Sequence, residues 1–174
     1  MDMVSLIPAD LITTQNLVYS PNGFDYSLLS IEAEGAEYGA CSFMLNGLSI
    51  LFRVAKTTPI KIGQFVTLWK RIGKSPIQPF DLSDSVDIFV ISIRQDNFFG
   101  QFVFPKMVLC EKGIVSRNGK GGKRAMRVYP PWDNPISQQA QKTQKWQLEY
   151  FLEIPQDRPI NSLRSHRLYG LCNS

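Results

Sequence analysis

The sequence predicts one α/β domain, with α+β as the alternative, built on a five- or six-stranded mixed sheet flanked by helices. Its 174 residues are a usual length for one domain, so we take residues 1–174 as a single unit. Hydrophobic residues make up 44% and charged residues 20%, which is ordinary for a soluble globular protein. Apolar runs rich in β-branched and aromatic residues alternate with segments of helical spacing, and this order predicts the fold class.

The first part of the chain predicts a helix followed by a β-hairpin. Apolar residues spaced through residues 6–19 indicate a helix that ends before "SPNG". Residues 26–35 fit either a strand or a second short helix. The strand-like runs "YGACSFML" and "LSILFRVA" then flank Asn46 and Gly47, and Asn-Gly between apolar runs is the strongest short signal for a hairpin.

A second helix is expected over residues 58–71. Thr58 is a suitable N-cap, and Pro59 stands at the position where a helix tolerates proline best. Four apolar side chains then recur at the spacing of one buried helical stripe: Ile62, Phe65, Val66 and Trp69.

The second half of the chain supplies the central strands and a last long helix. "SVDIFVISIR" and "FFGQFVFPK" are apolar throughout, as expected of strands covered on both faces, and "MVLC" extends the second of them. "RNGKGGK" is an exposed loop before the strand "RAMRVYP". "ISQQAQKTQKWQLEYFLEI" is helical with Ser137 as its N-cap, and the tail from Pro155 is irregular or a short helix.

Positive charge is concentrated in the middle of the chain. Residues 1–52 contain six acids and no Lys or Arg, whereas residues 53–127 contain fourteen Lys or Arg against five acids, a local net charge of +9. Such a block attracts polyanions and speeds their capture. The alternative is that the charge serves solubility alone.

The stretch "FRVAKTTPIKIGQFVTLWKR" predicts a phosphate seat at a strand-to-helix junction. Lys56 would stand at the carboxyl end of a strand, beside the free N–H groups of the following helix, with Arg53 and Lys61 nearby. Lys70 and Arg71 would end that helix as surface charges. The alternative for Arg53 is an ion pair with an acid of the first segment, Glu32, Glu34 or Glu37.

A second cationic segment spans residues 112–132, which hold six Lys or Arg and no acid. Its glycines let the backbone approach a ligand closely, but it is not a P-loop, because Arg124 stands where Ser or Thr is required. Arg beside aromatic side chains suits phosphate contact and base stacking. The alternative is a solvated loop. We expect phosphate contacts from Lys120, Lys123, Arg124 and Arg127, and stacking on Tyr129 and Trp132.

Signals for catalysis are weak. The patterns H-E-x-x-H and G-x-S-x-G and a His-rich metal spacing are absent from the sequence. We therefore expect no catalytic residue, no metal site and no cofactor. The open alternative is a divergent nuclease or phosphoryl hydrolase that uses Mg²⁺ or Mn²⁺, with Asp87 and Glu37 as its acids.

Cysteine content and hydropathy bear on the compartment. Cys41, Cys110 and Cys172 are too few and too scattered for a disulfide framework or a zinc site. No apolar run approaches the roughly 18 residues of a membrane span, and the start "MDMVSLIPADLITT" lacks the basic region of a signal peptide. We expect a cytoplasmic protein without membrane contact.

Four strings carry a family resemblance over about residues 38–152: "YGACSFMLNGLSILFRVAKTTPIKIGQFVTLWKR", "FGQFVFPKMVLCEKGI", "GGKRAMRVYPPWD" and "QAQKTQKWQLEYFL". They resemble the MepB-like family, which takes its name from a bacterial protein. The resemblance implies a restriction-endonuclease-like core and nucleic-acid binding. Nucleases of that fold place an acid two residues before a strand lysine, but Val54 stands there before Lys56, which argues against cleavage.

The expected function is thus an intracellular nucleic-acid-binding protein, with DNA as its partner and without nuclease activity. A metal-dependent enzyme is one alternative, and a module that binds an acidic protein is another. Neither the oligomeric state nor the choice between single and double strands follows from the sequence.

Overall fold

The structure, a computed structural model, describes residues 6–170 and has a mixed α/β fold with two sheets. The large sheet has six strands in the order β1-β2-β3-β6-β7-β9, which confirms the predicted mixed sheet. These strands are β1 (Tyr26–Ile31), β2 (Cys41–Leu45), β3 (Leu48–Val54), β6 (Ile88–Gln95), β7 (Phe98–Pro105) and β9 (Phe151–Glu153). The small sheet has the order β4-β5-β8, with β4 (Lys56–Thr57), β5 (Gln64–Thr67) and β8 (Ala125–Val128).

Four α-helices and three shorter helical turns complete the described chain. The α-helices are α1 (Ala9–Thr14), α2 (Lys106–Glu111), α3 (Gln138–Gln147) and α4 (Ser162–Leu168). A π-helical turn, η2 (Gln15–Tyr19), continues α1, so the helix predicted over residues 6–19 is confirmed. The 3-10 turns are η3 (Ala36–Tyr38) and η4 (Leu148–Tyr150). No helix within residues 6–170 is both long enough and apolar enough to cross a membrane.

The predicted hairpin at Asn46 and Gly47 joins β2 to β3. Both residues have positive φ, 49° and 80°, as a type I′ turn requires, and Leu45 pairs with Leu48 across it. Strand β3 then pairs in parallel with β6, whereas the other neighbours in the large sheet pair antiparallel. The parallel step requires a long crossover, and residues 55–87, which include β4 and β5, form it.

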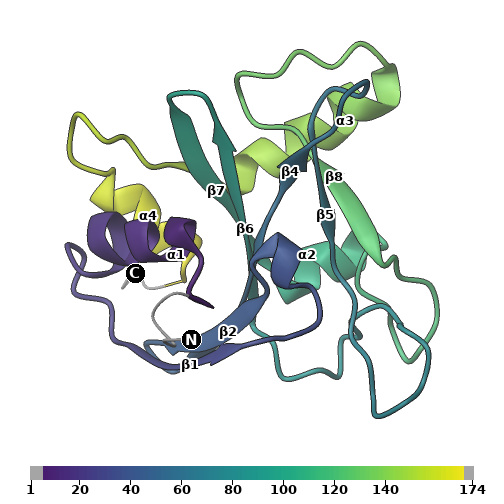
Figure 1. Ribbon diagram of the computed structural model, residues 1–174. Helices are drawn as coiled ribbons and strands as arrows, with labels where there is room; N and C mark the ends of the chain where they lie inside the picture. The colour runs from purple at the N-terminus through teal and green to yellow at the C-terminus, as the bar shows by residue number, and fades with distance from the viewer. Residues whose placement is uncertain (1–5, 171–174) are drawn as a thin grey trace.

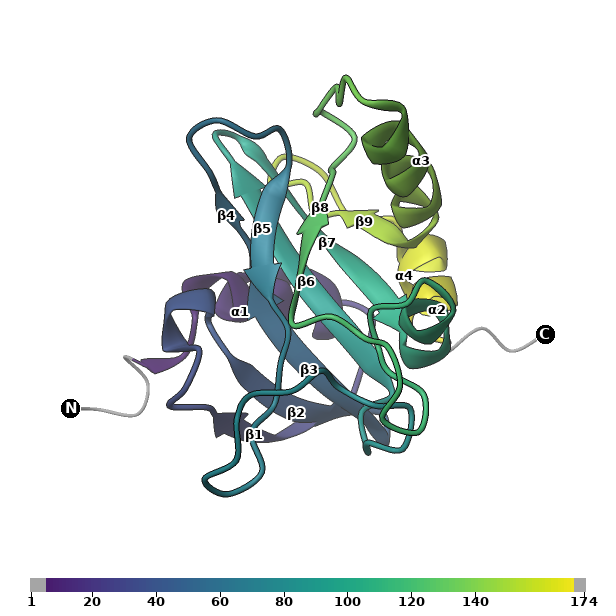
Figure 2. The same ribbon diagram turned by 90° about the vertical axis from the view of Figure 1, so that its right-hand side faces the viewer.

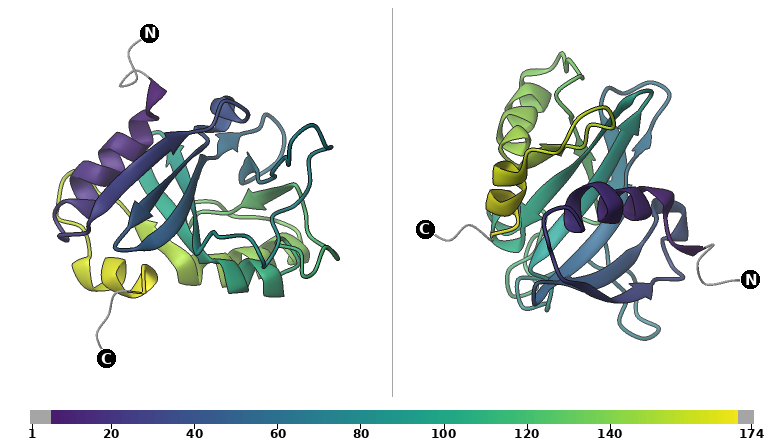
Figure 3. Two further views of the ribbon diagram at one scale, coloured as in Figure 1. Left: turned by 90° about the horizontal axis from the view of Figure 1, so that it is seen from below. Right: turned by 90° about the vertical axis from the view of Figure 1, so that its left-hand side faces the viewer.

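The large sheet is covered on both faces, as the apolar strands β6 and β7 predict. Figure 1 shows α1 and α4 on one side of this sheet and the small sheet with α2 on the other. Figure 3 shows α1 and α4 again on a common face. Ile50 and Phe52 of β3 belong to the apolar cluster under α1 and α4, whereas Leu51 belongs to the cluster that includes Val66 and Met126 of the small sheet.

The helix predicted over residues 58–71 is wrong, because this segment turns back and forms β5. Gln64 and Val66 point inward and are buried, while Phe65 and Thr67 on the outer face are half-exposed. This alternation has the period of a strand, not of a helix. Lys56 therefore does not stand beside a helix N-terminus, and Lys70 and Arg71 do not end a helix.

Two boundaries in the second half also differ from the predictions. "MVLC" does not extend β7 but forms α2, directly after Pro105. The last long helix begins as predicted, because the Ser137 side chain accepts a hydrogen bond from Ala140 N at 3.1 Å. It ends at Gln147, and the chain then enters η4 and β9 instead of continuing as helix to Ile154.

Candidate functional site

A groove lies between the outer face of the small sheet and α3, and we call it the β8–α3 groove. Figure 2 shows β4, β5 and β8 in front of the large sheet, with α3 to one side. Side chains of β5, β8 and α3 line the groove, and the loops at residues 60–62 and 135–137 form its rims. Its volume is about 740 Å³, within the roughly 300–1,000 Å³ range of small-ligand sites.

The charge of the β8–α3 groove is entirely positive. Four cations line it, and no Asp or Glu does so among the described residues. Within residues 6–170 none of the four forms an ion pair with a carboxylate. Three aromatic side chains, Phe65, Tyr129 and Trp146, also line the groove. The cations are Lys61, Lys112, Lys123 and Arg127.

Strand pairing places Arg127 on the outer face of the small sheet, where it lines the groove. Phe65 of β5 is the register partner of Arg127 on β8, and the guanidinium carbon lies 6.0 Å from the centre of the Phe65 ring. Arg127 Nη1 donates to Thr58 Oγ1 at 3.1 Å and to the carbonyl of Gly63 at 3.2 Å. Arg127 therefore fixes the loop after β4 with one nitrogen, and within residues 6–170 its other two nitrogens donate no hydrogen bond.

Close packing at Gly63 brings the same loop against Tyr129. Gly63 has a φ of +87°, a conformation that favours glycine. A Cβ there would lie 2.8 Å from the Tyr129 ring and 2.9 Å from the carbonyl of Val128. Glycine is thus required where the loop packs against the end of β8.

Glutamines on one side of α3 hold the opposite wall. The fully buried Gln147 accepts a hydrogen bond from Tyr129 N at 2.9 Å and donates to the carbonyl of Arg127 at 3.0 Å. Gln144 donates to the carbonyls of Pro130 and Asp133. Gln141 does the same for two carbonyls of the 135–137 rim. These amides bind α3 to β8 and to its following loop without adding charge.

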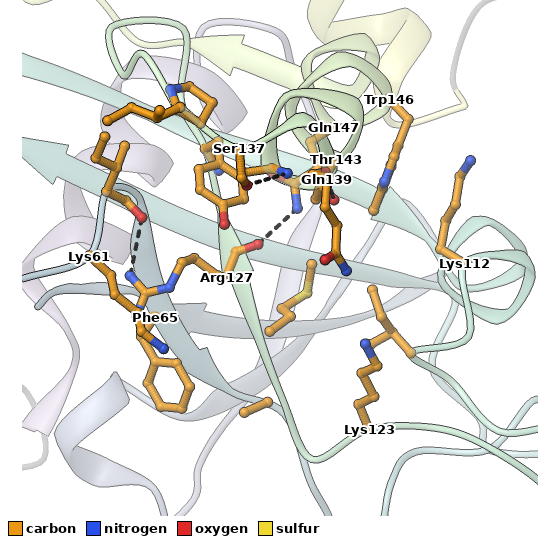
Figure 4. A pocket seen from close by; sticks show the side chains of 18 of the residues that line it. Lys61, Phe65, Lys112, Lys123, Arg127, Ser137, Gln139, Thr143, Trp146 and Gln147 are labelled. Atoms are coloured by element: carbon orange, nitrogen blue, oxygen red, sulfur yellow. Dashed lines mark hydrogen bonds between the residues drawn. The ribbon is translucent and has the colours of Figure 1, made fainter.

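The structure brings four of the nine predicted contact residues into the groove. They are Lys61, Lys123, Arg127 and Tyr129, and Figure 4 shows their surroundings. In this view Lys61 and Arg127 lie toward one end and Lys112 and Lys123 toward the other. The five predicted residues that do not line the groove are Arg53, Lys56, Lys120, Arg124 and Trp132.

Arg53 forms an ion pair with Glu32, which is the alternative to phosphate contact that the sequence leaves open. Its side chain is 4% exposed, and Nη2 donates to Glu32 Oε2 at 2.8 Å while Nη1 donates to the carbonyl of Phe52. Burial lowers the pKa of the guanidinium, and the charge of Glu32 counters that effect. Arg53 is therefore occupied within the fold.

Lys56 lies on an exposed part of the surface but also has protein partners. Its ammonium lies 3.4 Å from Glu37 Oε2 and 4.7 Å from the centre of the Tyr38 ring. Lys56 is the register partner of Phe65, so it shares the outer face of the small sheet with Arg127. The phosphate seat expected at a helix N-terminus is absent, because β4 and β5 occupy this segment.

The glycine-rich segment forms a tight, anchored turn. Arg117 and Lys120 exchange two backbone hydrogen bonds of 3.0 Å around Asn118 and Gly119, whose φ angles are positive. Asp81 holds this turn, since its carboxylate accepts hydrogen bonds from Ser116 Oγ at 2.6 Å and Gly119 N at 2.9 Å. These bonds, with two more from Ser83, hold the pKa of Asp81 well below its usual range. Lys120 and Arg124 are exposed outside the groove.

Trp132 belongs to a different part of the surface. Its ring stacks on Phe98 with 5.0 Å between ring centres and an interplanar angle of 15°. The indole Nε1 donates to Gln95 Oε1 at 3.1 Å. Trp132 thus fixes the β6–β7 hairpin to the loop after β8.

The candidate acids of the enzyme alternative have separate structural partners. Asp87 Oδ2 accepts a hydrogen bond from Ser49 N at 2.8 Å, and Glu37 pairs with Lys56. Neither lines the β8–α3 groove. No group of three or more His, Cys, Asp or Glu side chains within residues 6–170 has a geometry that could hold a metal ion.

Three charged or aromatic groove residues, Phe65, Lys112 and Trp146, are not among the predicted contacts. The helical spacing predicts that Phe65 is buried in a helix. The alternation of buried and half-exposed residues around Val66 instead places Phe65 on the outer face of a strand. Lys112 belongs to the cationic segment, but its place after α2 depends on that unpredicted helix. Trp146 is a large aromatic residue on a helix that is otherwise mostly polar. This contrast in the sequence is what marks it as a candidate contact residue.

Comparison with known proteins agrees with the resemblance carried by the four strings. The MepB-like family model matches residues 32–153. Among solved structures, the crystal structure of MepB is similar to this chain, with a TM-score of 0.72 and 33% sequence identity. The match covers 84% of this chain and 97% of that one. None of the curated proteins compared with the chain matches it. The chain belongs to the MepB-like family.

Proposed function

We propose that this MepB-like protein binds nucleic acid, with DNA as the expected partner, through the β8–α3 groove and in the cytoplasm of a bacterial cell. The observation that carries the proposal is the lining of the groove: four cations, three aromatic side chains and no acid among the described residues. Lys and Arg without a carboxylate partner are free to neutralise phosphates, and aromatic faces stack on bases of any sequence.

The positions of the acids support binding without cleavage. Phosphodiester hydrolysis by metal ions needs carboxylates that converge beside the scissile phosphate. Glu37 and Asp87, the two candidate acids, are engaged by Lys56 and by the backbone of Ser49. Neither contributes to the groove. We therefore propose a binding protein, not a nuclease.

The salt dependence of affinity tests the proposal. Each neutralised phosphate contributes a slope of about −0.9 on duplex DNA or −0.7 on a single strand, so four contacts give about −3.6 or −2.8 in log K against log salt. Lys123→Ala should flatten the slope by about 1. Lys74→Ala is the matched control, because Lys74 is exposed and does not line the groove. Fluorescence anisotropy of labelled oligonucleotides measures both slopes, and an affinity independent of salt would contradict the proposal.

Two further measurements separate the alternatives. Incubation of DNA and RNA with Mg²⁺ or Mn²⁺ should leave the strands intact, and cleavage that Asp87→Ala abolishes would instead make the protein an enzyme. Polyglutamate of matched charge should compete weakly, since it offers no bases to the aromatic side chains. Binding of polyglutamate as tight as that of DNA would indicate an acidic protein partner.

A further inference from the structure

We infer that a water molecule is bound inside the protein, where the small sheet departs from the large one, and donates a hydrogen bond to the side chain of Gln64. The inference is independent of the proposed function, because Gln64 lies on the inner face of β5 and does not line the β8–α3 groove. Three observations carry it: the burial of Gln64, the single hydrogen bond of its side chain, and the contrast with two other buried glutamines.

The two sheets separate at the end of β3. Val54 is the last residue of β3 that pairs with β6, and the backbone N–H of Ala55 still donates to the carbonyl of Ser92 on β6 at 3.0 Å. Lys56 then begins β4 in the small sheet, whereas β6 continues beyond this point. The carbonyl of Arg94 points to the same side of β6 as that of Ser92, because backbone groups two residues apart in a strand share a direction. It therefore faces a place that β3 has already left.

Gln64 supplies the hydrogen bond that β3 no longer provides. It is 1% exposed, and its side chain points from β5 toward the large sheet, where Nε2 donates to the carbonyl of Arg94 at 3.0 Å. A buried carbonyl needs such a donor, because few buried backbone groups in native proteins are unpaired. The bond also fixes the orientation of the amide. Turning the amide over would bring Oε1 against the carbonyl oxygen of Arg94, and two acceptors repel each other.

The oxygen of the same amide has no donor among the described residues. Within residues 6–170, Gln64 Oε1 is shielded from solvent and accepts no hydrogen bond. A buried amide oxygen in that state is costly, and internal water is the usual donor where protein groups do not reach. A water molecule meets this need because it donates to Oε1 with one hydrogen and keeps its other hydrogen and its lone pairs for neighbouring polar groups.

Two other glutamines of the described chain are buried as completely, and both ends of their amides are engaged. Gln101 Oε1 accepts a hydrogen bond from the hydroxyl of Tyr169, and its Nε2 donates to Thr14 Oγ1 at 3.4 Å. Gln147 makes two hydrogen bonds to the backbone at the end of β8. The fold thus pairs both ends of a buried amide where its own groups lie within reach. Gln64 is the exception among the three, and this points to a donor from the solvent.

Magnetic relaxation dispersion of water tests the inference, because it counts internal water molecules that stay bound for long times. We expect the count to fall by one water molecule in Gln64→Met, whose side chain is similar in size and has no amide oxygen. Gln101→Met is the matched control: it removes a buried amide whose partners are protein groups, so its count should not fall. In the unchanged protein we also expect a nuclear Overhauser cross-peak between water and the side-chain amide protons of Gln64, with the sign of a long-lived contact.

An unchanged count in Gln64→Met, with no such cross-peak in the unchanged protein, would overturn the inference. An equal fall in both variants would also overturn it, because the loss would then follow from removing any buried amide. If Gln64→Met does not fold, the cross-peak decides alone, since it is measured on the unchanged protein: its presence supports the bound water and its absence overturns it. Neither readout involves nucleic acid, so the proposed function can fail while this inference stands.

Discussion

Two cationic regions of the molecule look alike in sequence and differ in structure. Around β3, β4 and the segment after β5, four cations each pair with an acid at 2.6–3.4 Å. In the β8–α3 groove, four cations have no carboxylate partner within residues 6–170. The pairs of the first region are Arg53–Glu32, Lys56–Glu37, Lys70–Asp84 and Arg71–Glu34.

The difference shows that a segment rich in Lys and Arg does not by itself give a positively charged surface, because folding can pair those side chains with acids from elsewhere in the chain. Three of the four pairing acids come from residues 1–52, the segment that contains no Lys or Arg. The fold brings this acidic segment against the first half of the basic block and neutralises it. Asp10 of the same segment also pairs with Arg94. The groove cations have no carboxylate partner within residues 6–170, so the unneutralised positive charge lies where β8 and α3 meet.

The largest effect should come from removing three groove lysines together. The triple variant Lys61→Ala, Lys112→Ala and Lys123→Ala should weaken nucleic-acid binding roughly 100- to 500-fold at about 0.1 M salt, because each lost contact contributes roughly 5- to 8-fold under these conditions. All three are exposed and have no carboxylate partner among the described residues, so the free energy of unfolding should change by less than about 0.5 kcal/mol. Anisotropy and urea unfolding measure the two quantities. An affinity within about twofold of that of the unchanged protein would show that these lysines do not contact the ligand.

Arg53→Met should have the opposite effects: it should lower the stability of the protein and leave its affinity for nucleic acid unchanged. It removes the partner of Glu32 and the guanidinium donor to the carbonyl of Phe52, so the free energy of unfolding should fall by about 2 kcal/mol. Binding by the folded variant should stay unchanged, since Arg53 is buried away from the groove. Urea unfolding at neutral pH measures the loss. A weakened affinity with intact stability would move Arg53 into the binding surface.

Acid should weaken the anchor of the cationic turn. Because hydrogen bonds from Ser116, Gly119 and Ser83 depress the pKa of Asp81 in the folded state, its stabilising contribution is complete above the unfolded pKa of about 3.9. It is lost as the pH falls below that value toward the folded pKa. Asp81→Asn should therefore lower the free energy of unfolding at pH 7, and the deficit should shrink below about pH 4.

Urea unfolding at several pH values checks this prediction. Asp157→Asn serves as the control, since Asp157 is an exposed acid whose pair with Arg158 lies on the surface. A deficit for Asp81→Asn that stays constant across the pH range would show that the carboxylate does not act through its charge.

The smallest effect should come from Lys56→Ala. Its pair with Glu37 is long and exposed, with side-chain exposures of 45% and 71%, and such pairs contribute about 0–1 kcal/mol. The salt slope of binding should not change. A slope flattened by about 1 would show that Lys56 leaves Glu37 to contact a phosphate. The binding surface would then extend from the β8–α3 groove to β4.

Much of the fold could be predicted from local sequence, and the failures had non-local causes. The Asn46–Gly47 turn and the Ser137 cap are decided by adjacent residues, and both are confirmed. Strand β5 pairs with β8 about sixty positions later in the chain, and its inward Gln64 weakens the alternation that would mark a strand. Ile62, Phe65 and Val66 meanwhile match a helical spacing by coincidence, so the pattern predicts a helix where β5 forms.

The candidate site could be predicted in composition but not in shape. The sequence predicts Lys61, Lys123 and Arg127 as phosphate contacts and Tyr129 as a stacking residue, and all four line the groove. What the sequence could not show is that α3 lies beside β8, since this depends on the side chain of Gln147 bonding to strand backbone. Trp146 and Arg127 line the same groove only because α3 packs beside β8, and nothing in the sequence shows that they lie close together.

The amides that bind α3 to β8 have a consequence for how the groove responds to its surroundings. Gln141, Gln144 and Gln147 carry no charge, so ionic strength hardly affects the bonds that set the spacing of the walls. The lysines that face the groove are fully subject to screening. Salt should thus release a bound polyanion without changing the distance between the two walls of the groove.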